Sequence, residues 1–240
     1  MIDSPLVTCI VPTFNSARSV RHALESIFAQ THRPLQVVVA DDGSTDDTLG
    51  IVRSVSRAID ITAHATAGPA AARNRGLRAA CGDLVAFLDA DKEWHPEKLA
   101  RQVVRFGARP NLEVCLSHMQ MVWSEEHATE QAGVHERRCA ATVPGYATTT
   151  MLARRTLFDL IGAVDRDLCF VDATDWLLRA TQRGICVEML ADVLTYHRVQ
   201  GSSNLTAAQS DACHVEFLHL IKRTLDRQRG RGPDSRIEAS

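Results

Sequence analysis

The sequence predicts a single α/β domain built on a Rossmann-like, mostly parallel sheet with helices on both faces. Its 240 residues, 45% of them hydrophobic, suit one domain of this kind. Short apolar runs alternate with segments of helical spacing in the first half of the chain. The runs are continuously apolar, which is typical of parallel strands buried on both faces. Because such sheets bind ligands beyond the carboxyl ends of their strands, the residues directly after each strand are candidates for a site.

The first half predicts four strands, each followed by a turn and a helix. Val20, Leu24 and Ile27 recur at helical spacing after the first strand. Ser44 and Asp47 have the spacing of a capping box before the second helix. The strands are expected at residues 6–11, 35–40, 59–65 and 84–88, and the helices at 17–30, 45–55, 68–81 and 96–106.

The second half is less regular and shows no internal repeat. Residues 227–240 are rich in Arg, Gly, Pro and Ser, which is typical of disorder. We therefore expect one domain over residues 1–226 and a disordered tail over 227–240. Strands are expected at 114–123, 148–153 and 186–190, helices at 155–161, 174–183 and 214–227, and a polar segment without clear period at 125–143.

Composition excludes several classes of partner and location. The formal net charge is -2 and the pI is about 6.5, so no basic field indicates nucleic acid or an anionic membrane surface as a partner. The seven cysteines form no CxxC pair, which favours reduced thiols and a cytoplasmic location. The N-terminus lacks a signal sequence, and no apolar run approaches the roughly 20 residues that span a bilayer.

Asp89 and Asp91 come directly after the fourth expected strand. Two carboxylates at this spacing are costly to hold together unless a cation or the amides of a turn neutralise them. The pair therefore predicts a Mg²⁺ or Mn²⁺ that also binds substrate phosphates. The alternative is a turn in which Asp91 caps the segment after it.

Polar residues at two further places belong to the same predicted edge. Asp41 ends the second strand, where it is a candidate to accept a hydrogen bond from a base N–H, with a turn as the alternative. Arg73 and Arg75 lie at the start of a helix whose N-terminal amides favour anions, so either could hold phosphates. The alternative for each arginine is a surface charge or a salt bridge.

Four sequence blocks, in this order, resemble the signatures of family 2 glycosyltransferases with the A-type fold. They are VTCIVPTFN at 7–15, VVADDGSTD at 38–46, GPAAARNRG at 68–76 and FLDAD at 87–91. The close resemblance covers about residues 6–106. It implies an inverting, metal-dependent enzyme that moves a sugar from a nucleotide-sugar donor, expected to be a UDP-sugar, to a hydroxyl acceptor. Residues 1–106 would then bind the donor and 107–226 the acceptor.

The resemblance also implies roles for single residues of the first half. A carboxylate would remove the acceptor proton while the metal stabilises the departing nucleotide diphosphate. Asp89 would lie at the ribose or the sugar. The donor would be bound by Pro12, Thr13, Asp41, Arg73, Asp89 and Ala90, and the metal by Asp91.

The catalytic base is the first open point. The segment FVDATDWLLR at 170–179 resembles one in which an acidic pair precedes a helix and the second acid is the base. Ala173 stands at that second position. Either Asp172 or Asp175 is therefore the base, or the site lacks one.

The metal shell is the second open point. Lys92 stands where many relatives carry a third acidic residue. If its side chain pointed inward it would weaken metal affinity or assist phosphate binding, and we expect it to be exposed to solvent instead. The segment YHRVQGSSNLT at 196–206 resembles one whose histidine often completes the metal shell. Gln200 takes that place here, and His197 is the alternative ligand. Trp94, beyond Asp91, is a candidate to stack on the acceptor or to pack at a helix start.

Rival classes of enzyme require a different loop after the first strand. A nucleotidyltransferase or a dehydrogenase would carry a glycine-rich loop where residues 12–15 stand. The main alternative is a catalytically impaired protein of the same fold, lacking a base at Ala173, that binds nucleotide sugars or a partner protein. The sequence leaves the sugar and the acceptor open, whether saccharide, peptide or small molecule.

Overall fold

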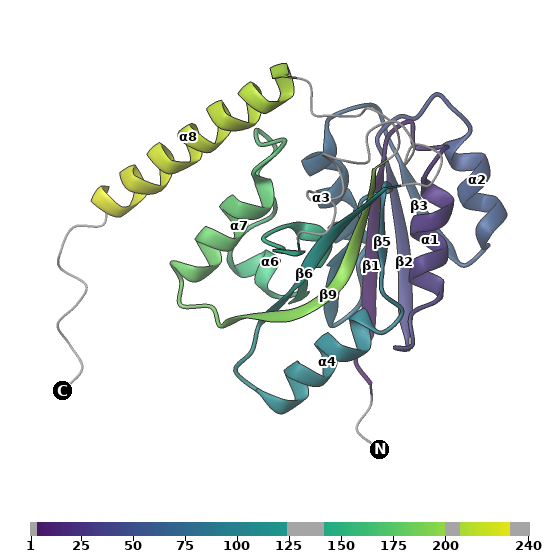
Figure 1. Ribbon diagram of the computed structural model, residues 1–240, viewed down its shortest axis with the longest axis horizontal. Helices are drawn as coiled ribbons and strands as arrows, with labels where there is room; N and C mark the ends of the chain where they lie inside the picture. The colour runs from purple at the N-terminus through teal and green to yellow at the C-terminus, as the bar shows by residue number, and fades with distance from the viewer. Residues whose placement is uncertain (1–3, 124–141, 200–206, 231–240) are drawn as a thin grey trace.

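Each apolar run expected as a strand in the first half is a strand of one sheet in the computed structural model (Figure 1). The structure describes residues 4–123, 142–199 and 207–230. Its strands are β1 (Val7–Thr13), β2 (Leu35–Asp41), β3 (Ile59–Ala63), β4 (Leu84–Phe87), β5 (Lys92–Trp94), β6 (Val114–Trp123), β7 (Thr142–Pro144), β8 (Leu152–Arg154) and β9 (Val187–Val199). Its helices are α1 (Val20–Phe28), α2 (Thr48–Val55), α3 (Pro69–Ala79), α4 (Lys98–Ala108), α6 (Leu157–Leu160), α7 (Asp172–Thr181) and α8 (Ala207–Gly230), with a 3-10 turn, η2 (Thr148–Thr150).

The predicted α/β class is confirmed, and parallel pairs occur in both halves of the chain, with β6 parallel to β9 in the second half. β1 pairs in parallel with β2 and β4, and β2 pairs in parallel with β3. The second half makes the sheet mixed, because β8 is antiparallel to both β4 and β6, and β9 is antiparallel to β5. Within the described ranges the strand order is β3-β2-β1-β4-β8-β6-β9-β5, with β7 paired to β6.

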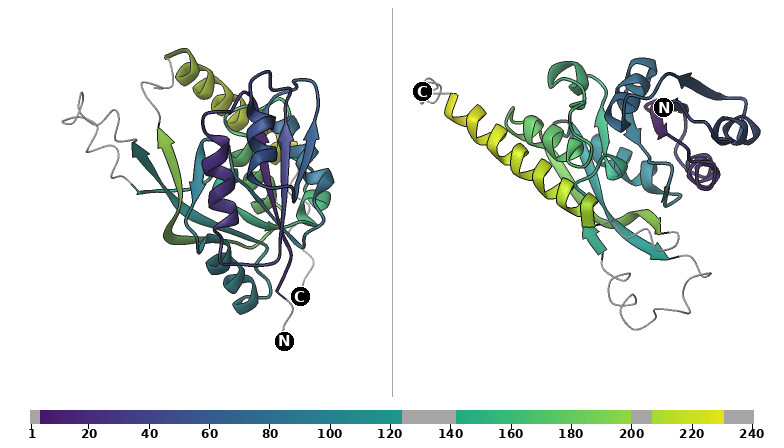
Figure 2. Two further views of the ribbon diagram at one scale, coloured as in Figure 1. Left: turned by 90° about the vertical axis from the view of Figure 1, so that its right-hand side faces the viewer. Right: turned by 90° about the horizontal axis from the view of Figure 1, so that it is seen from above.

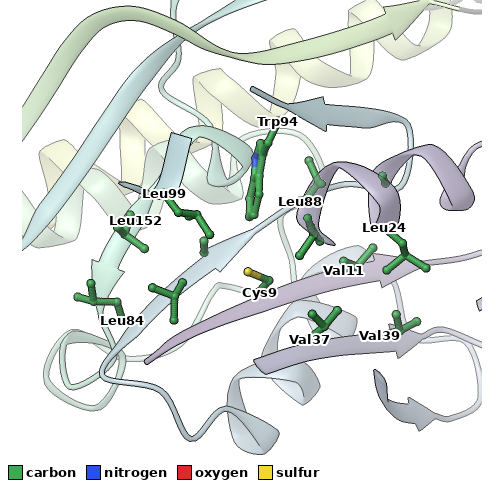
Figure 3. Packing of buried hydrophobic residues seen from close by; sticks show 14 of the residues in the cluster. Cys9, Val11, Leu24, Val37, Val39, Leu84, Leu88, Trp94, Leu99 and Leu152 are labelled. Carbon is green, nitrogen blue, oxygen red and sulfur yellow. The ribbon is translucent and has the colours of Figure 1, made fainter. Parts of the chain in front are cut away.

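Helices cover both faces of the sheet because alternate residues of the central strands are buried on opposite sides. Cys9 and Val11 of β1 pack with residues of α1, α2 and α4, as Figure 3 shows for Leu24 and Leu99. Ile10, between them in sequence, packs on the other face with α3, α6 and α7. The result is a three-layer arrangement with a core on each side of the sheet.

Two strands differ from the sequence-based expectation in a way that affects the site. β5 is a short strand that begins at Lys92 and has no apolar run to reveal it. It forms because β9 runs on to Val199, well beyond the expected 186–190, and pairs with it so that Lys92 lies opposite His197. The long-range pairing thus brings together two segments that are far apart in the chain.

Several local expectations were wrong. No capping box precedes α2: Asp47 is the N-cap without a side-chain hydrogen bond, and Asp46 accepts from the Thr48 amide instead, at 3.0 Å. α4 begins at Lys98 rather than at 96. α8 starts earlier than expected and continues to Gly230, into the segment expected to be disordered, and residues 231–240 lie outside the described ranges.

α8 lies along the outside of α7, away from the sheet (Figures 1 and 2). Leu220 of α8 is buried against Leu168 and Val171, which directly precede α7. None of the helices in the described part of the chain is long and apolar enough to cross a membrane. The cysteines whose side chains are described, five in number, are free thiols, and Cys9 and Cys115 among them are buried.

Lys98 is an ionisable group placed inside the core beneath β5. Its side chain is fully buried, and its ammonium lies 4.4 Å from the centre of the Trp94 ring. Nζ donates a hydrogen bond to Gln102 Oε1 at 2.8 Å, and Gln102 in turn donates to the carbonyls of Cys115 and Thr150. Burial without a carboxylate partner lowers the pKa of Lys98 to about 7 from an ordinary value of 10.5.

The lowered pKa of Lys98 predicts a pH-dependent stability. Between pH 7 and 10.5 the unfolded chain holds a proton on Lys98 that the folded chain has lost. The free energy of unfolding should therefore rise with pH in this window by up to about 1.4 kcal/mol per pH unit. Lys98→Met should lack this rise, while Lys222→Met at an exposed position should keep it. Denaturant unfolding at pH 7, 8 and 9 measures the difference, and parallel curves for Lys98→Met and the parent would contradict it.

Candidate functional site

A pocket of about 590 Å³ opens beyond the carboxyl ends of β1, β2 and β4. This is the edge that the sequence predicted for a ligand, because parallel strands all end there. The wall combines backbone of the β1 turn, the N-terminal turn of α3 and acidic side chains after β2 and β4. The lining residues are Pro12, Thr13, Phe14, Ser16, Ser19, Asp42, Thr66, Gly68, Pro69, Ala72, Arg73, Asp89, Ala90, Asp91 and Lys92.

Asp41 holds the turn after β2 and does not line the pocket. Its buried carboxylate accepts hydrogen bonds from the Thr13 hydroxyl at 3.0 Å and from the amides of Gly43 and Ser44 at 3.1 and 2.9 Å. Gly43 has φ +85, and a Cβ there would lie 2.9 Å from the Thr66 hydroxyl, so the tight turn requires glycine. The structure therefore supports the alternative in which Asp41 stabilises a turn.

Asp42, the next residue, faces the pocket. Its carboxylate accepts from the amides of Ala67 and Gly68, at 2.8 to 3.1 Å, and forms a buried ion pair with Arg75. These bonds attach the loop before α3 to the end of β2. Arg75 thus lies in a salt bridge, which was the alternative to phosphate binding. Asp42, rather than the expected Asp41, lines the pocket.

Arg73 joins the two halves of the chain. Its guanidinium is buried, with Nη2 donating to Asp89 Oδ1 at 2.7 Å and Nη1 donating to Asp172 Oδ2 at 2.6 Å. Its Nε is buried without a hydrogen-bond partner in the described structure. Burial alone would lower the pKa of Arg73, but the charges of Asp89 and Asp172 outweigh it and leave the pKa raised.

The expectation that Lys92 is exposed was wrong. Only 15% of its side chain is exposed, and its Nζ lies 3.0 Å from Asp89 Oδ2 and 3.0 Å from Asp91 Oδ1. Burial would raise the pKa of Asp89, but the charges of Lys92 and Arg73 hold it well below its usual range. The pKa of Lys92 is raised, because the two carboxylates outweigh the effect of its burial.

His197 lies on the other side of Asp91. Its Nε2 is 3.2 Å from Asp91 Oδ2, and this contact helps to lower the pKa of Asp91 against the opposing effect of burial. The pairing of β5 with β9 produces the contact, since His197 is opposite Lys92 in the sheet. The structure therefore brings together two of the three expected metal ligands. The third, Gln200, lies outside the described residues.

The described part of the site does not hold a complete set of ligands for a divalent cation. Among the residues that the structure describes, no three His, Cys, Asp or Glu side chains are arranged to hold a metal ion. The position between the carboxylates of Asp89 and Asp91 is taken by the Lys92 ammonium, which already neutralises them. The Lys92 ammonium thus stands where a cation shared by the two aspartates would bind.

The two candidate bases have different surroundings. Asp175 is fully buried, and its Oδ2 accepts from Arg179 Nε at 2.7 Å, while Arg179 also donates to two backbone carbonyls. Asp172, at the start of α7, contacts Arg73, which lines the pocket. Burial raises the pKa of Asp172, and the charge of Arg73 only partly offsets this. Ala173, between them, is buried and carries no group that could move a proton.

Trp94 is a core residue rather than an acceptor platform. Its ring is 3% exposed, and its Nε1 donates to the Thr149 carbonyl at 2.8 Å. It lies in the cluster between the sheet and α4, where Figure 3 shows it near Leu99. The structure therefore supports a packing role for Trp94 rather than stacking on the acceptor.

Glu216 of α8 is a site-supporting residue that the sequence analysis missed. Its carboxylate accepts hydrogen bonds from the amides of Cys169, Phe170 and Val171 at 2.7, 2.6 and 2.9 Å. These amides directly precede α7, so Glu216 fixes the turn that presents Asp172. Nothing in the local sequence of either segment indicates the contact, because the two are brought together only by the docking of α8 on α7 (Figure 2).

Comparison with known proteins places the chain in a family. The description Glycosyl transferase family 2 matches residues 8–160, more than half of the chain, and the chain belongs to this family. An uncharacterized glycosyltransferase of Nostoc sp. is 27% identical over 88% of this chain and 70% of its own. The Escherichia coli UDP-Glc:alpha-D-GlcNAc-diphosphoundecaprenol beta-1,3-glucosyltransferase WfaP is 36% identical over 41% of this chain and 40% of its own.

Solved structures confirm the A-type glycosyltransferase fold. A mannosyltransferase of Pyrobaculum calidifontis, solved with GDP-Man and Mn²⁺, superimposes with a TM-score of 0.72 at 25% identity, over 92% of this chain and 65% of that one. Staphylococcus aureus TarS 1-349 with UDP-GlcNAc has a TM-score of 0.69 at 22% identity, over 84% of this chain and 60% of that one. The chain thus spans less than two thirds of these proteins, and nucleotide sugars bind to both of them.

The Arg73 contacts predict an asymmetric effect on stability. Arg73→Met should lower the free energy of unfolding by about 3–5 kcal/mol, because it leaves the buried Asp172 carboxylate without a cation and Asp89 with Lys92 alone. Asp172→Asn should cost less, roughly 1–3 kcal/mol, because Arg73 keeps Asp89. Arg78→Met, on the exposed side of the same helix, is the matched control and should change little. Denaturant unfolding measures all three, and equal losses for Arg73→Met and Asp172→Asn would refute the ranking.

The Glu216 contacts predict a local effect. Glu216→Gln should speed hydrogen exchange of the amides at 169–171 by about tenfold, because charge-assisted hydrogen bonds are stronger than neutral ones. Exchange in the β1–β4 core should not change. Mass spectrometry of peptic peptides reads both regions, with Glu25→Gln at an exposed position of α1 as the control. Unchanged exchange at 169–171 would show that Glu216 does not hold this turn.

Proposed function

We propose that this chain transfers a sugar from a nucleotide-sugar donor to a hydroxyl acceptor, with inversion at the anomeric carbon. The observation that carries the proposal is the pocket beyond β1, β2 and β4, in which Arg73 and Lys92 supply positive charge beside Asp89 and Asp91. A nucleoside diphosphate carries the negative charge that such a pair of cations can bind. Family membership and the nucleotide sugars bound to two proteins of the same fold support it.

The β2 end of the pocket is the proposed nucleoside side. Pro12 and Thr13, the last two residues of β1, line it together with Asp42, which contributes a carboxylate. A carboxylate accepts hydrogen bonds only, so it suits a base that presents an N–H, as uracil does. We therefore assign the base contact to Asp42 rather than to Asp41, and a UDP-sugar remains the expected donor.

The β4 end is the proposed diphosphate and sugar side. Asp89, Ala90 and Asp91 come directly after the strand there, and Arg73 and Lys92 lie within hydrogen-bond distance of the two carboxylates. The expected Mg²⁺ or Mn²⁺, with Asp91, His197 and Gln200 as ligands, is not part of this proposal. The Lys92 ammonium occupies the position between the aspartates, and we route no step through a metal.

Asp172 is the proposed base. A base in an inverting transfer takes the proton from the acceptor hydroxyl as the oxygen attacks C1, while the nucleotide diphosphate leaves with the bonding electrons. Asp172 suits this role because it contacts the pocket residue Arg73 and has a raised pKa, whereas Asp175 is fully buried with Arg179. A diphosphate that binds Arg73 would compete for the guanidinium and free the Asp172 carboxylate.

A second function has one observation in its favour. Ala173 carries no proton-transfer group at the position where the family resemblance expects the base, and Asp172 is held by Arg73. A chain that binds nucleotide sugars without transferring them would have this arrangement. A cytoplasmic location is proposed for either function, supported by the free thiols of Cys9 and Cys115.

Nucleotide binding and turnover separate the two functions. Calorimetry with UDP, GDP and CDP should show binding, with UDP the tightest of the three. Incubation with UDP-glucose or UDP-N-acetylglucosamine should release UDP, slowly with water and faster with a hydroxyl acceptor. Tight binding without any release from either donor favours the non-catalytic function, and absence of nucleotide binding rejects both.

The role of Asp172 predicts a change in rate and in pH profile. Asp172→Asn should lower kcat by about 10²–10⁴-fold, the contribution typical of a general base, and should retain UDP binding. In the parent, kcat/KM should fall as the pH drops through the pKa of Asp172, which lies above its ordinary 3.8, because protonation removes the base. This acidic limb should disappear in Asp172→Asn.

Two further variants complete the test of the base. Asp167→Asn, at an exposed position of the same region, should leave the rate and the pH profile unchanged. Asp175→Asn should lower stability without moving the acidic limb, because its carboxylate serves Arg179 inside the fold. Loss of the limb in Asp175→Asn but not in Asp172→Asn would reassign the base to Asp175.

A further inference from the structure

We propose that Lys92 supplies, from the chain itself, the cation between Asp89 and Asp91, so that donor binding at this site does not require a divalent metal. The inference rests on the proposed function, because it names the group that meets the diphosphate of the donor. It concerns a residue that the sequence analysis expected to be exposed to solvent. Its support comes from the position of the ammonium, the contacts that hold it there and the charge that remains for a metal.

The position of the ammonium is fixed by contacts on both sides. Nζ lies 3.0 Å from Asp89 Oδ2 and 3.0 Å from Asp91 Oδ1, and only 15% of the Lys92 side chain is exposed to solvent. The Lys92 amide donates to the Asp89 carbonyl at 3.0 Å, which closes the turn between the two aspartates. The pairing of β5 with β9, which sets Lys92 opposite His197, completes the support.

The free hydrogen-bonding capacity of Lys92 suits a phosphate. An ammonium has three N–H donors, and two of them go to Asp89 and Asp91. The third is left for a ligand in the pocket that Lys92 helps to line. A lysine acts on phosphate as a compact positive charge, which is the same task that a bound cation performs.

The basic side chains already present compete with a metal for the carboxylates of the site. From His197 the contacts run through Asp91, Lys92, Asp89 and Arg73 to Asp172, so each carboxylate already meets a basic side chain. A divalent ion between Asp89 and Asp91 would have to displace the ammonium and would then lie beside a like charge. A diphosphate at this place would instead meet the ammonium of Lys92 and the guanidinium of Arg73.

Calorimetry with UDP is the first test. The parent chain should bind UDP equally well, within about twofold, in excess EDTA and in Mn²⁺. Lys92→Met removes the charge at nearly constant volume and should weaken UDP binding in EDTA by about tenfold or more, the size expected for a lost charged hydrogen bond. Mn²⁺ should restore part of that loss, because Asp89, Asp91 and His197 are then open to a metal. Lys92→Arg should retain binding in EDTA, and Lys222→Met should behave as the parent.

Electron paramagnetic resonance of Mn²⁺ alone is the second test and needs no nucleotide. The parent should leave the free Mn²⁺ signal unchanged at concentrations where Lys92→Met diminishes it. If Lys92→Met does not fold, as its melting curve would show, Lys92→Arg and the parent still give the EDTA comparison. UDP binding that requires Mn²⁺ in the parent, or Mn²⁺ bound by the parent, overturns the inference while leaving the proposed function standing. Absence of UDP binding under all conditions rejects the proposed function, and the Mn²⁺ signal still decides the role of Lys92.

Discussion

The buried guanidinium of Arg73 is the interaction on which the rest of the site depends. It contacts Asp89 after β4 and Asp172 at the start of α7, and so connects the parallel part of the sheet to a helix of the second half. A charge removed from water needs opposite charges beside it. Asp89 after β4 and Asp172 in the first turn of α7 must therefore stay beside Arg73. Glu216 of α8 supports this position, because it accepts a hydrogen bond from the amide of Phe170, just before α7.

Alternation of charge then extends from Arg73 along the edge of the sheet. Asp89 meets both Arg73 and Lys92, Asp91 meets Lys92 and His197, and these contacts account for the opposite pKa shifts of the acids after β4 and of the two cations. Such a network is organised before a ligand arrives, so an anion that enters finds donors already in place. In the proposed function, a diphosphate would take the place of carboxylate oxygens at these donors.

Much of the fold and part of the site could be predicted from residue patterns alone. Continuous apolar runs before Pro12, Asp41 and Asp89 predicted parallel strands with polar ends at one edge, and the pocket is at that edge. Residue patterns could not decide between Asp41 and Asp42, because both come at the end of β2. In the structure Asp41 accepts from the amide of Ser44 in the turn, whereas Asp42 accepts from the amide of Gly68 at the pocket wall. Helical spacing placed Asp172 and Asp175 on one face, but it could not show which of them contacts the pocket residue Arg73.

The sequence by itself determined the family, the α/β order and the edge of the sheet that carries the site, because these depend on local apolar periodicity and on short blocks of neighbouring residues. Only the tertiary structure decided the state of Lys92, the environment of Asp172 and the function of Glu216. Each depends on residues brought from far along the chain, by the pairing of β5 with β9, by Arg73 and by the docking of α8. Long-range contacts of this kind leave no periodic signal, since their energy comes from charges that meet only in the folded molecule.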